Sequence, residues 1–176
     1  MQRLIVTGSN GTGKSHLAAR LNAAHPDIAV VSFDAIKLTR NWSQRPRPEI
    51  DAELAQVIAG EAWILEGGPS LLDQALARAE IVLWIDPPEY VRVWRLLTRP
   101  WRNFGKTRAE LPDGNVDWPL QQYKFALRSF KNRSKFRRKI ASSLEAARLN
   151  AASAAQVWHC RTRADLDAAV KAWAEG

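Results

Sequence analysis

Residues 8–15 have the residue types and spacing of a polyphosphate-binding turn. They are Gly-Ser-Asn-Gly-Thr-Gly-Lys-Ser and match the pattern G-x-x-x-x-G-K-[ST] in full. Glycines accept positive φ angles and let backbone N–H groups approach an anion, while lysine and serine side chains can hold phosphate oxygens and Mg²⁺. The segment therefore predicts binding of a nucleoside triphosphate, with ATP as the default and GTP not excluded.

The positions in this segment have distinct expected roles. We expect Lys14 to reach the β- and γ-phosphates and the Ser15 hydroxyl to bind Mg²⁺ directly. A helix that opens at Lys14 adds the positive end of its dipole. The residues of this region that are predicted to contact the nucleotide are Gly8, Asn10, Gly11, Thr12, Gly13, Lys14, Ser15 and His16.

Three carboxylates, Asp34, Glu66 and Asp86, each follow a predicted strand. Ligands of open α/β sheets collect beyond the carboxyl ends of the strands, and phosphoryl transfer needs acids for the metal and for the acceptor. We predict that Asp34 binds the acceptor and is the candidate general base, and that Glu66 holds the metal or its waters. Asp86 is an alternative that precedes two prolines. Each of the three could instead cap a helix or a turn.

The second half of the chain is strongly basic. Residues 1–88 have 8 Lys and Arg against 10 Asp and Glu, whereas residues 89–176 have 18 against 8, so the halves carry net charges of −2 and +10. Such a surface attracts phosphates of a small nucleotide or of a nucleic acid, and composition does not choose between them.

Residues 98–118 lack periodicity and are too long for an ordinary connector, which predicts a lid, with a disordered insert as the alternative. Cations that close over a phosphoryl group stabilise its charge once water is excluded, so Arg99 and Arg133 are predicted to be catalytic. The other arginines and the lysine considered for the lid or the following helix are Arg95, Arg102, Lys106, Arg108, Arg128, Arg137 and Arg138. The cations expected on a solvated face are Lys124, Lys131 and Lys139.

Aromatic residues are interleaved with these cations, and rings of this kind can stack on bases. Their helical spacing instead favours the core. The residues concerned are Trp101, Phe104, Trp118, Tyr123, Phe125 and Phe130.

Apolar runs of strand length alternate with helical patterns, which indicates βαβ units, a mostly parallel sheet and the α/β class. The expected strands span residues 4–6, 28–33, 63–65, 81–85 and 156–159. The expected helices span residues 14–24, 48–60, 71–79, 89–97, 120–147 and 164–174.

The composition, with 176 residues, 46% of them hydrophobic, predicts one compact soluble domain. The longest apolar run, residues 81–85, is far too short to cross a membrane. The single cysteine, Cys160, can form no intrachain disulfide, which favours a reducing cytoplasm.

The chain resembles the adenylate-kinase-like P-loop kinases, and most closely the DNA topology modulation (FlaR-like) proteins. The resemblance rests on residues 8–15, on Asp34, on the Trp-Ile-Leu-Glu-Gly run at 63–67, on residues 81–87 and on the Gly-Lys-Thr-Arg run at 105–108. Ser70 departs from the arginine that nucleoside monophosphate kinases have there.

This resemblance implies the three-layer P-loop NTPase fold, with a five-stranded parallel sheet in the order 2-3-1-4-5 and a short basic lid. By position, Arg95 matches the residue that stacks on adenine in adenylate kinases, and Arg99 matches one that touches the phosphates.

The leading hypothesis is an ATP- and Mg²⁺-dependent kinase that transfers the γ-phosphoryl group to a small acceptor, held between Asp34, residues 42–47 and the lid. The alternative is a nucleic-acid-binding P-loop NTPase or a nucleotide-gated regulator, and a third possibility is a nucleotide-binding protein without turnover. A membrane partner is not expected.

Overall fold

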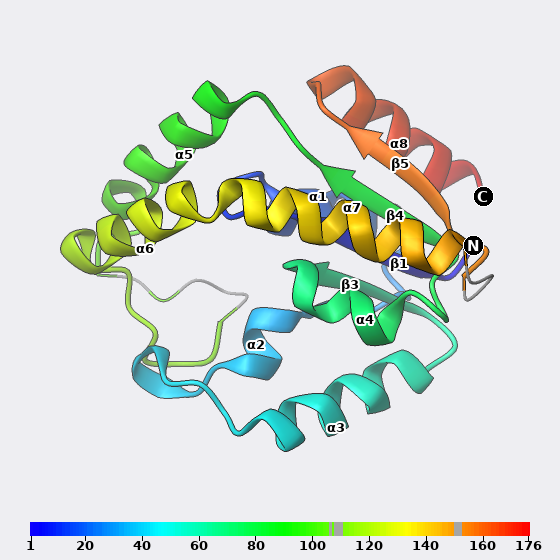
Figure 1. The fold of residues 1–176 in the computed structure, drawn as a ribbon, viewed down its shortest axis with the longest axis horizontal. Helices are drawn as coiled ribbons and strands as arrows, with labels where there is room; N and C mark the ends of the chain where they lie inside the picture. The colour runs from blue at the N-terminus through cyan, green and yellow to red at the C-terminus, as the bar shows by residue number, and fades with distance from the viewer. Residues whose placement is uncertain (106, 108–110, 150–152) are drawn as a thin grey trace.

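The computed structural model describes residues 1–105, 107, 111–149 and 153–176. Five strands form one all-parallel sheet in the order β2-β3-β1-β4-β5 (Figure 1). This confirms the α/β class and the strand order implied by the resemblance. The strands are β1 (Arg3–Gly8), β2 (Val30–Ser32), β3 (Trp63–Gly67), β4 (Ile81–Ile85) and β5 (Gln156–Cys160).

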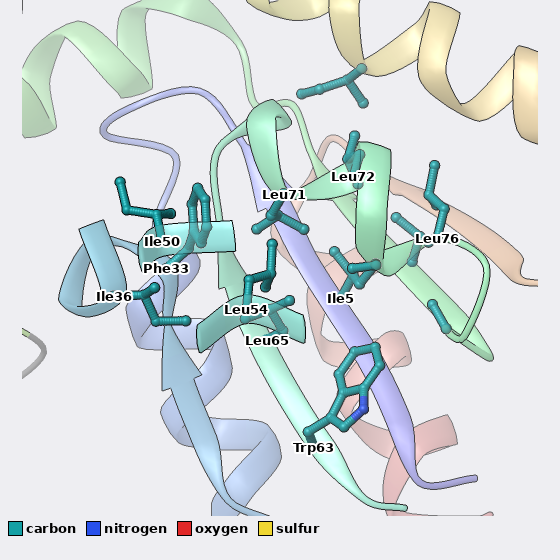
Figure 2. Close-up of a cluster of buried hydrophobic side chains, with 14 residues drawn as sticks. Ile5, Phe33, Ile36, Ile50, Leu54, Trp63, Leu65, Leu71, Leu72 and Leu76 are labelled. Atoms are coloured by element: carbon teal, nitrogen blue, oxygen red, sulfur yellow. The ribbon is translucent and has the colours of Figure 1, made fainter. Parts of the chain in front are cut away.

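Helices cover both faces of this sheet, because alternate residues of each central strand point to opposite sides. In β1, Leu4 and Val6 pack with α1 and α8, whereas Ile5 packs with α3, α4 and α7 on the side shown in Figure 2. None of the helices in the described ranges has the length and apolar character needed to cross a membrane. The helices are α1 (Lys14–Ala24), α2 (Phe33–Lys37), α3 (Arg47–Ala59), α4 (Leu72–Ala75), α5 (Glu89–Arg102), α6 (Pro119–Lys131), α7 (Arg133–Leu149) and α8 (Arg163–Glu175), with 3₁₀ turns η1 (Arg40–Trp42) and η2 (Pro69–Leu71).

The single helix expected over residues 120–147 is wrong, because the structure has two helices, α6 and α7, that meet at Asn132. The Asn132 N–H donates to the Arg128 carbonyl of α6, and the Asn132 carbonyl accepts from the Phe136 N–H of α7. The two helices have different partners, since α6 packs on α5 and α7 packs on α4. The break therefore follows from tertiary packing.

Two other boundaries differ from the expected ones near the candidate site. The helix expected to end at Leu97 continues to Arg102, and Pro100 lies buried in its last turns, where its missing N–H costs one hydrogen bond. The strand expected over residues 28–33 ends at Ser32, so Asp34 lies in the first turn of α2 rather than at a strand end.

The lone thiol at the end of β5 gives a test of the core. Cys160 is buried, and burial, together with the charge of Asp165, raises the pKa of its thiol to about 11. Because the thiolate is the reactive form, we expect iodoacetamide to leave Cys160 unmodified at pH 8 in the folded protein and to label it after denaturation. Rapid labelling of the folded protein, measured by intact mass, would contradict this burial.

Candidate active site

The turn between β1 and α1 places glycines where other residues would be strained. Gly11 has φ 82° and Gly13, the residue that precedes α1, has φ 98°. A Cβ atom on Gly11 would lie 2.7 Å from Leu96 Cγ, so the turn lies directly on α5. We call residues 8–15 the phosphate loop. These glycines give it the shape of an anion cradle that larger residues would fill.

Hydrogen bonds within the phosphate loop hold it closed. The Thr12 hydroxyl donates to the Ser9 carbonyl at 2.9 Å, and Lys14 Nζ donates to the same carbonyl at 3.3 Å. Gly13, the residue that precedes α1, has no side chain that could accept a hydrogen bond from the first N–H groups of this 11-residue helix. A helix N-terminus of this kind supplies donors and a positive dipole end to an anion.

Two arginines of helix α5 donate hydrogen bonds to backbone carbonyls of the phosphate loop. Arg92 Nη1 donates to the Asn10 carbonyl at 3.1 Å, and Arg95 Nη1 donates to the Thr12 carbonyl at 2.6 Å. Arg95 thus lies at the loop, beside the position expected for a nucleotide. Arg92 is not among the residues predicted from the sequence to bind or act. Its spacing from Leu96 and Pro100, the other buried residues of α5, is the signal that could have indicated its burial.

The pKa of the Lys14 amine responds to the charges of several residues from other segments. Burial lowers the pKa of the Lys14 amine, the carboxylates of Glu66 and Asp34 act in the opposite direction, and the cations Arg99 and Lys37 lower it further. The charges of Asp34, Glu66 and Arg99, which were predicted from three other segments of the chain, therefore all act on the Lys14 amine.

Glu66 is fixed at the end of β3. It is buried, it lies opposite Ser32 in the β2–β3 register, and its Oε1 accepts a hydrogen bond from the Ser32 hydroxyl at 2.7 Å. In the neighbouring pair, Glu66 lies opposite Val6 of β1, which leads into the phosphate loop. The carboxylate is thus held rigidly beside the phosphate loop.

The donor set near the phosphate loop fits Mg²⁺ rather than a metal held entirely by protein. Within the described residues, no three His, Cys, Asp or Glu side chains gather at a metal-binding spacing. Mg²⁺ commonly takes one or two protein oxygens and completes its octahedron with phosphates and waters. Ser15, partly exposed in the first turn of α1, and Glu66 could supply such oxygens. His16, also in this turn, is exposed.

Asp34 is the accessible carboxylate of the site. Its side chain is 42% exposed and forms an ion pair with Lys37 at 2.8 Å. The Lys37 ammonium also lies 5.2 Å from the centre of the Phe33 ring. The short helix α2 therefore presents a carboxylate whose neighbouring cation is fixed by two contacts, an arrangement that can accept a hydrogen bond from a hydroxyl.

The remaining predicted residues lie around α5. Arg99 Nη2 donates to Gln122 Oε1 at 2.9 Å, so α6 orients this guanidinium. Arg133 forms an ion pair with Glu89 at 2.9 Å and is linked to the phosphate loop through Glu89 and Arg92. Asp86 pairs with Arg137 at 2.6 Å and lies 3.3 Å from His159, which is typical of a structural ion pair.

The end of the expected lid is bound to the η1 turn. Asn115 is buried, and its Oδ1 accepts from the Trp42 N–H at 2.6 Å. Its Nδ2 donates to the carbonyls of Thr39 (2.9 Å) and Pro112 (2.8 Å). The Trp42 indole N–H donates to the Val116 carbonyl at 3.2 Å. Residues 112–116 are therefore bound to the turn that follows α2. Lys106 and Arg108, which the sequence assigned to the lid, lie outside the described residues.

We expect Asn115→Ala to loosen this connection, because it leaves the Trp42 N–H and the Thr39 carbonyl without their partner. The loss should be about 1–3 kcal/mol, seen as faster hydrogen exchange in residues 38–43 and 111–117 with the strands unaffected. Asn115→Asp keeps the acceptor but turns both donors into a carboxylate oxygen that faces the Thr39 and Pro112 carbonyls in a buried site, so its effect should be at least as large. Unchanged exchange in both variants would show that the contact carries no energy.

Three of the aromatic residues that were expected in the core are exposed, so this part of the prediction is wrong. Trp101, Phe104 and Trp118 have exposed fractions of 67%, 54% and 52%. Phe104 and Trp118 pack edge to face at 5.7 Å, and Trp101 donates to the Tyr123 hydroxyl at 2.6 Å. The chain thus carries large rings on a basic surface.

The fold is similar to that of solved small-molecule kinases over almost the whole chain. Shikimate kinase from Bacteroides thetaiotaomicron has 18% identity and a TM-score of 0.54, with 99% of this chain and 97% of that chain covered. Shikimate kinase from Acinetobacter baumannii, solved in complex with shikimate, has 16% identity and a TM-score of 0.52, with 98% and 90% covered.

An uncharacterized protein from Eubacterium ventriosum is similar in the same way, with 14% identity, a TM-score of 0.53 and 98% of each chain covered. No family model matches this chain, and no curated protein matches its sequence. Similarity at these identities concerns the fold alone. This chain shares its α/β fold, with one all-parallel five-stranded sheet, with these shikimate kinases.

Proposed function

We propose that this protein is an ATP- and Mg²⁺-dependent phosphotransferase that transfers the γ-phosphoryl group to a small acceptor. The observation that carries the proposal is the phosphate loop at the start of α1, with Gly11 and Gly13 at positive φ and with the charges of Asp34, Glu66 and Arg99 acting on its Lys14 amine. Phosphoryl transfer depends on positioning and on cationic stabilisation, and this group of residues supplies both. The similarity in fold to two shikimate kinases supports a small-molecule acceptor.

Each residue has a defined role in this proposal. The phosphate loop and Arg95 bind the nucleotide, and Lys14 and Arg99 neutralise charge on the transferring group. Ser15 and Glu66 would hold Mg²⁺, which would supply charge neutralisation to the phosphates. Asp34 accepts the proton of the acceptor hydroxyl. Arg133 stays a prediction as a further catalytic cation, since its contact here is with Glu89.

The finer family assignment belongs to this proposal as well. The motifs at residues 8–15, 63–67 and 105–108 support an adenylate-kinase-like enzyme close to the FlaR-like proteins, acting as one domain over residues 1–176 with a lid over 98–118. Ser70, which stands where nucleoside monophosphate kinases have arginine, favours an acceptor other than a nucleoside monophosphate. ATP is the proposed donor, and GTP is the alternative to be compared with it.

The test is a screen of nucleosides, nucleotides, sugars and hydroxy acids with ATP labelled at the γ-phosphate and Mg²⁺. The expected result is one acceptor class that is labelled by the wild type and not by Lys14→Ala. The same screen with labelled GTP compares the donors. Labelling of no acceptor above the Lys14→Ala background would overturn the proposal.

A second candidate function, a nucleic-acid-binding NTPase, is favoured by the exposed rings of Trp101, Phe104 and Trp118 in the basic half of the chain. Stacking rings among cations are typical of single-strand binding. Under this alternative, affinity for single strands should fall steeply with salt and should drop at least about tenfold in Trp101→Ala. Affinity equal to that of an unrelated protein of the same charge would rule it out.

A further inference from the structure

Arg92 is a buried cation for which the proposed chemistry has no use. It is 2% exposed, although it lies on α5 within the basic half of the chain. Its Nη1 donates to the Asn10 carbonyl at 3.1 Å and to the Ser129 hydroxyl at 2.9 Å. Its Nε donates to Glu89 at 3.2 Å, and its guanidinium lies 5.0 Å from the centre of the Phe130 ring. One side chain thus connects three parts of the structure.

The partners of Arg92 belong to elements with different tasks. Asn10 lies in the phosphate loop, whereas Ser129 and Phe130 lie near the end of α6, the helix that follows the lid segment and also orients Arg99 through Gln122. A guanidinium stays charged at every physiological pH, so a buried one requires all of its partners. Since the same Arg92 Nη1 donates to Ser129 of α6 and to the Asn10 carbonyl, a shift of α6 would change the hydrogen bond to Asn10.

The contact between the phosphate loop and α5 leaves little room for independent movement. A Cβ atom on Gly11 would lie 3.3 Å from Arg92 Cγ, in addition to its close approach to Leu96. The carbonyls on either side of Gly11, those of Asn10 and Thr12, accept from Arg92 and Arg95. Because these two carbonyls point to the guanidinium groups of α5, the N–H groups of the loop can point to a bound anion.

We infer that Arg92 is a positioning residue that sets the shape of the phosphate loop and couples it to the position of α6. The inference rests on the proposed function, because a polyphosphate is the ligand whose binding is coupled. Coupling is reciprocal, so if the Ser129 contact on α6 strengthens nucleotide binding, nucleotide binding must stabilise α6 by the same factor. Arg92 itself needs no contact with the nucleotide.

Two variants separate this role from general stability. Arg92→Lys keeps the charge but lacks the planar fork that reaches Asn10 and Ser129 together. Ser129→Ala removes the hydrogen bond to α6 and keeps the contact with the Phe130 ring. The matched control is Ser142→Ala, which removes an exposed hydroxyl of α7 that donates to the Lys139 carbonyl of its own helix. Thermal unfolding identifies folded variants, and if Arg92→Lys does not fold, Ser129→Ala decides the question.

The first measurement is calorimetric titration with MgATP. We expect about tenfold weaker binding in Arg92→Lys, about threefold to tenfold weaker binding in Ser129→Ala, and a change below about twofold in Ser142→Ala. If the wild type binds and both of the first two variants bind equally well, the coupling is wrong while the proposed function stands. If the folded wild type does not bind MgATP, both are wrong.

The second measurement is hydrogen exchange in α6, a readout that a merely structural role would not move. MgATP should slow the exchange of residues 122–131 in the wild type, and this protection should be lost in Ser129→Ala at saturating MgATP. Protection of α6 that is equal in the wild type and in Ser129→Ala would overturn the coupling, whatever the stability of the variants.

Discussion

Lys14→Ala is expected to lower phosphoryl transfer by about 10²–10³-fold or more, the range found when one preorganised charge-stabilising group is removed. The Lys14 ammonium is held over the phosphate loop by the Ser9 carbonyl, so it needs little reorganisation to meet a phosphate. Turnover at saturating MgATP with the acceptor found in the screen measures this effect. Lys171→Ala, at an exposed lysine of α8, is the control and should keep wild-type turnover.

The same variant should not lower stability. Burial is the largest cause of the lowered pKa of Lys14, which means that the charged amine is less favourable in the folded chain than in water. Between the lowered pKa and the ordinary one, the unfolded chain binds more protons, so the contribution of this group to stability rises with pH across that interval. A melting temperature of Lys14→Ala well below that of the wild type would show that the lysine has a structural role instead.

The balance of charges around Lys14 also predicts a pH dependence of binding. Phosphate groups favour the ammonium form and would raise the pKa of Lys14 from its lowered value, so nucleotide binding at alkaline pH should take up a proton. Affinity for MgATP should therefore weaken as the pH rises through that range, and calorimetry in buffers of different ionisation enthalpy counts the proton. The uptake should be absent in Lys14→Ala.

The parts of the site that are local in sequence could be predicted without a structure. The phosphate loop is one run of eight residues, and its glycines, lysine and serine carry their chemistry in their spacing. The position of Glu66 could be predicted because the ends of parallel strands share one edge of the sheet, whereas Asp34, expected at a strand end, lies in the first turn of α2, close after β2. That edge also explains why both carboxylates act on the pKa of Lys14.

The parts that depend on distant contacts could not be predicted. The role of Arg92 requires Asn10 and Ser129 to meet on one guanidinium, and they are separated by more than a hundred residues. Asn115 likewise joins Trp42 from another part of the chain. For Trp101, helical spacing favoured the core, but spacing does not show whether another element covers the ring, and Trp101 is exposed at the end of α5.

Asp34→Asn is expected to separate transfer from binding. The amide keeps the size of the carboxylate but cannot take a proton from an acceptor hydroxyl, a role that contributes about 10²–10⁴-fold to a rate. We therefore expect transfer to fall by about that factor. Affinity for MgATP should stay the same or increase, because one negative charge near Lys14 and the phosphates is removed.

The matched control for this variant is Asp167→Asn on α8. Asp167 is similarly exposed, at 51% against 42% for Asp34, and it also pairs with a cation at 2.8 Å, in this case Arg20. The control should therefore reproduce any general cost of losing a surface ion pair without touching transfer. If Asp34→Asn transferred phosphate as fast as Asp167→Asn, Asp34 would not be the general base, and its charge would serve to hold Lys37 and to support the ammonium of Lys14.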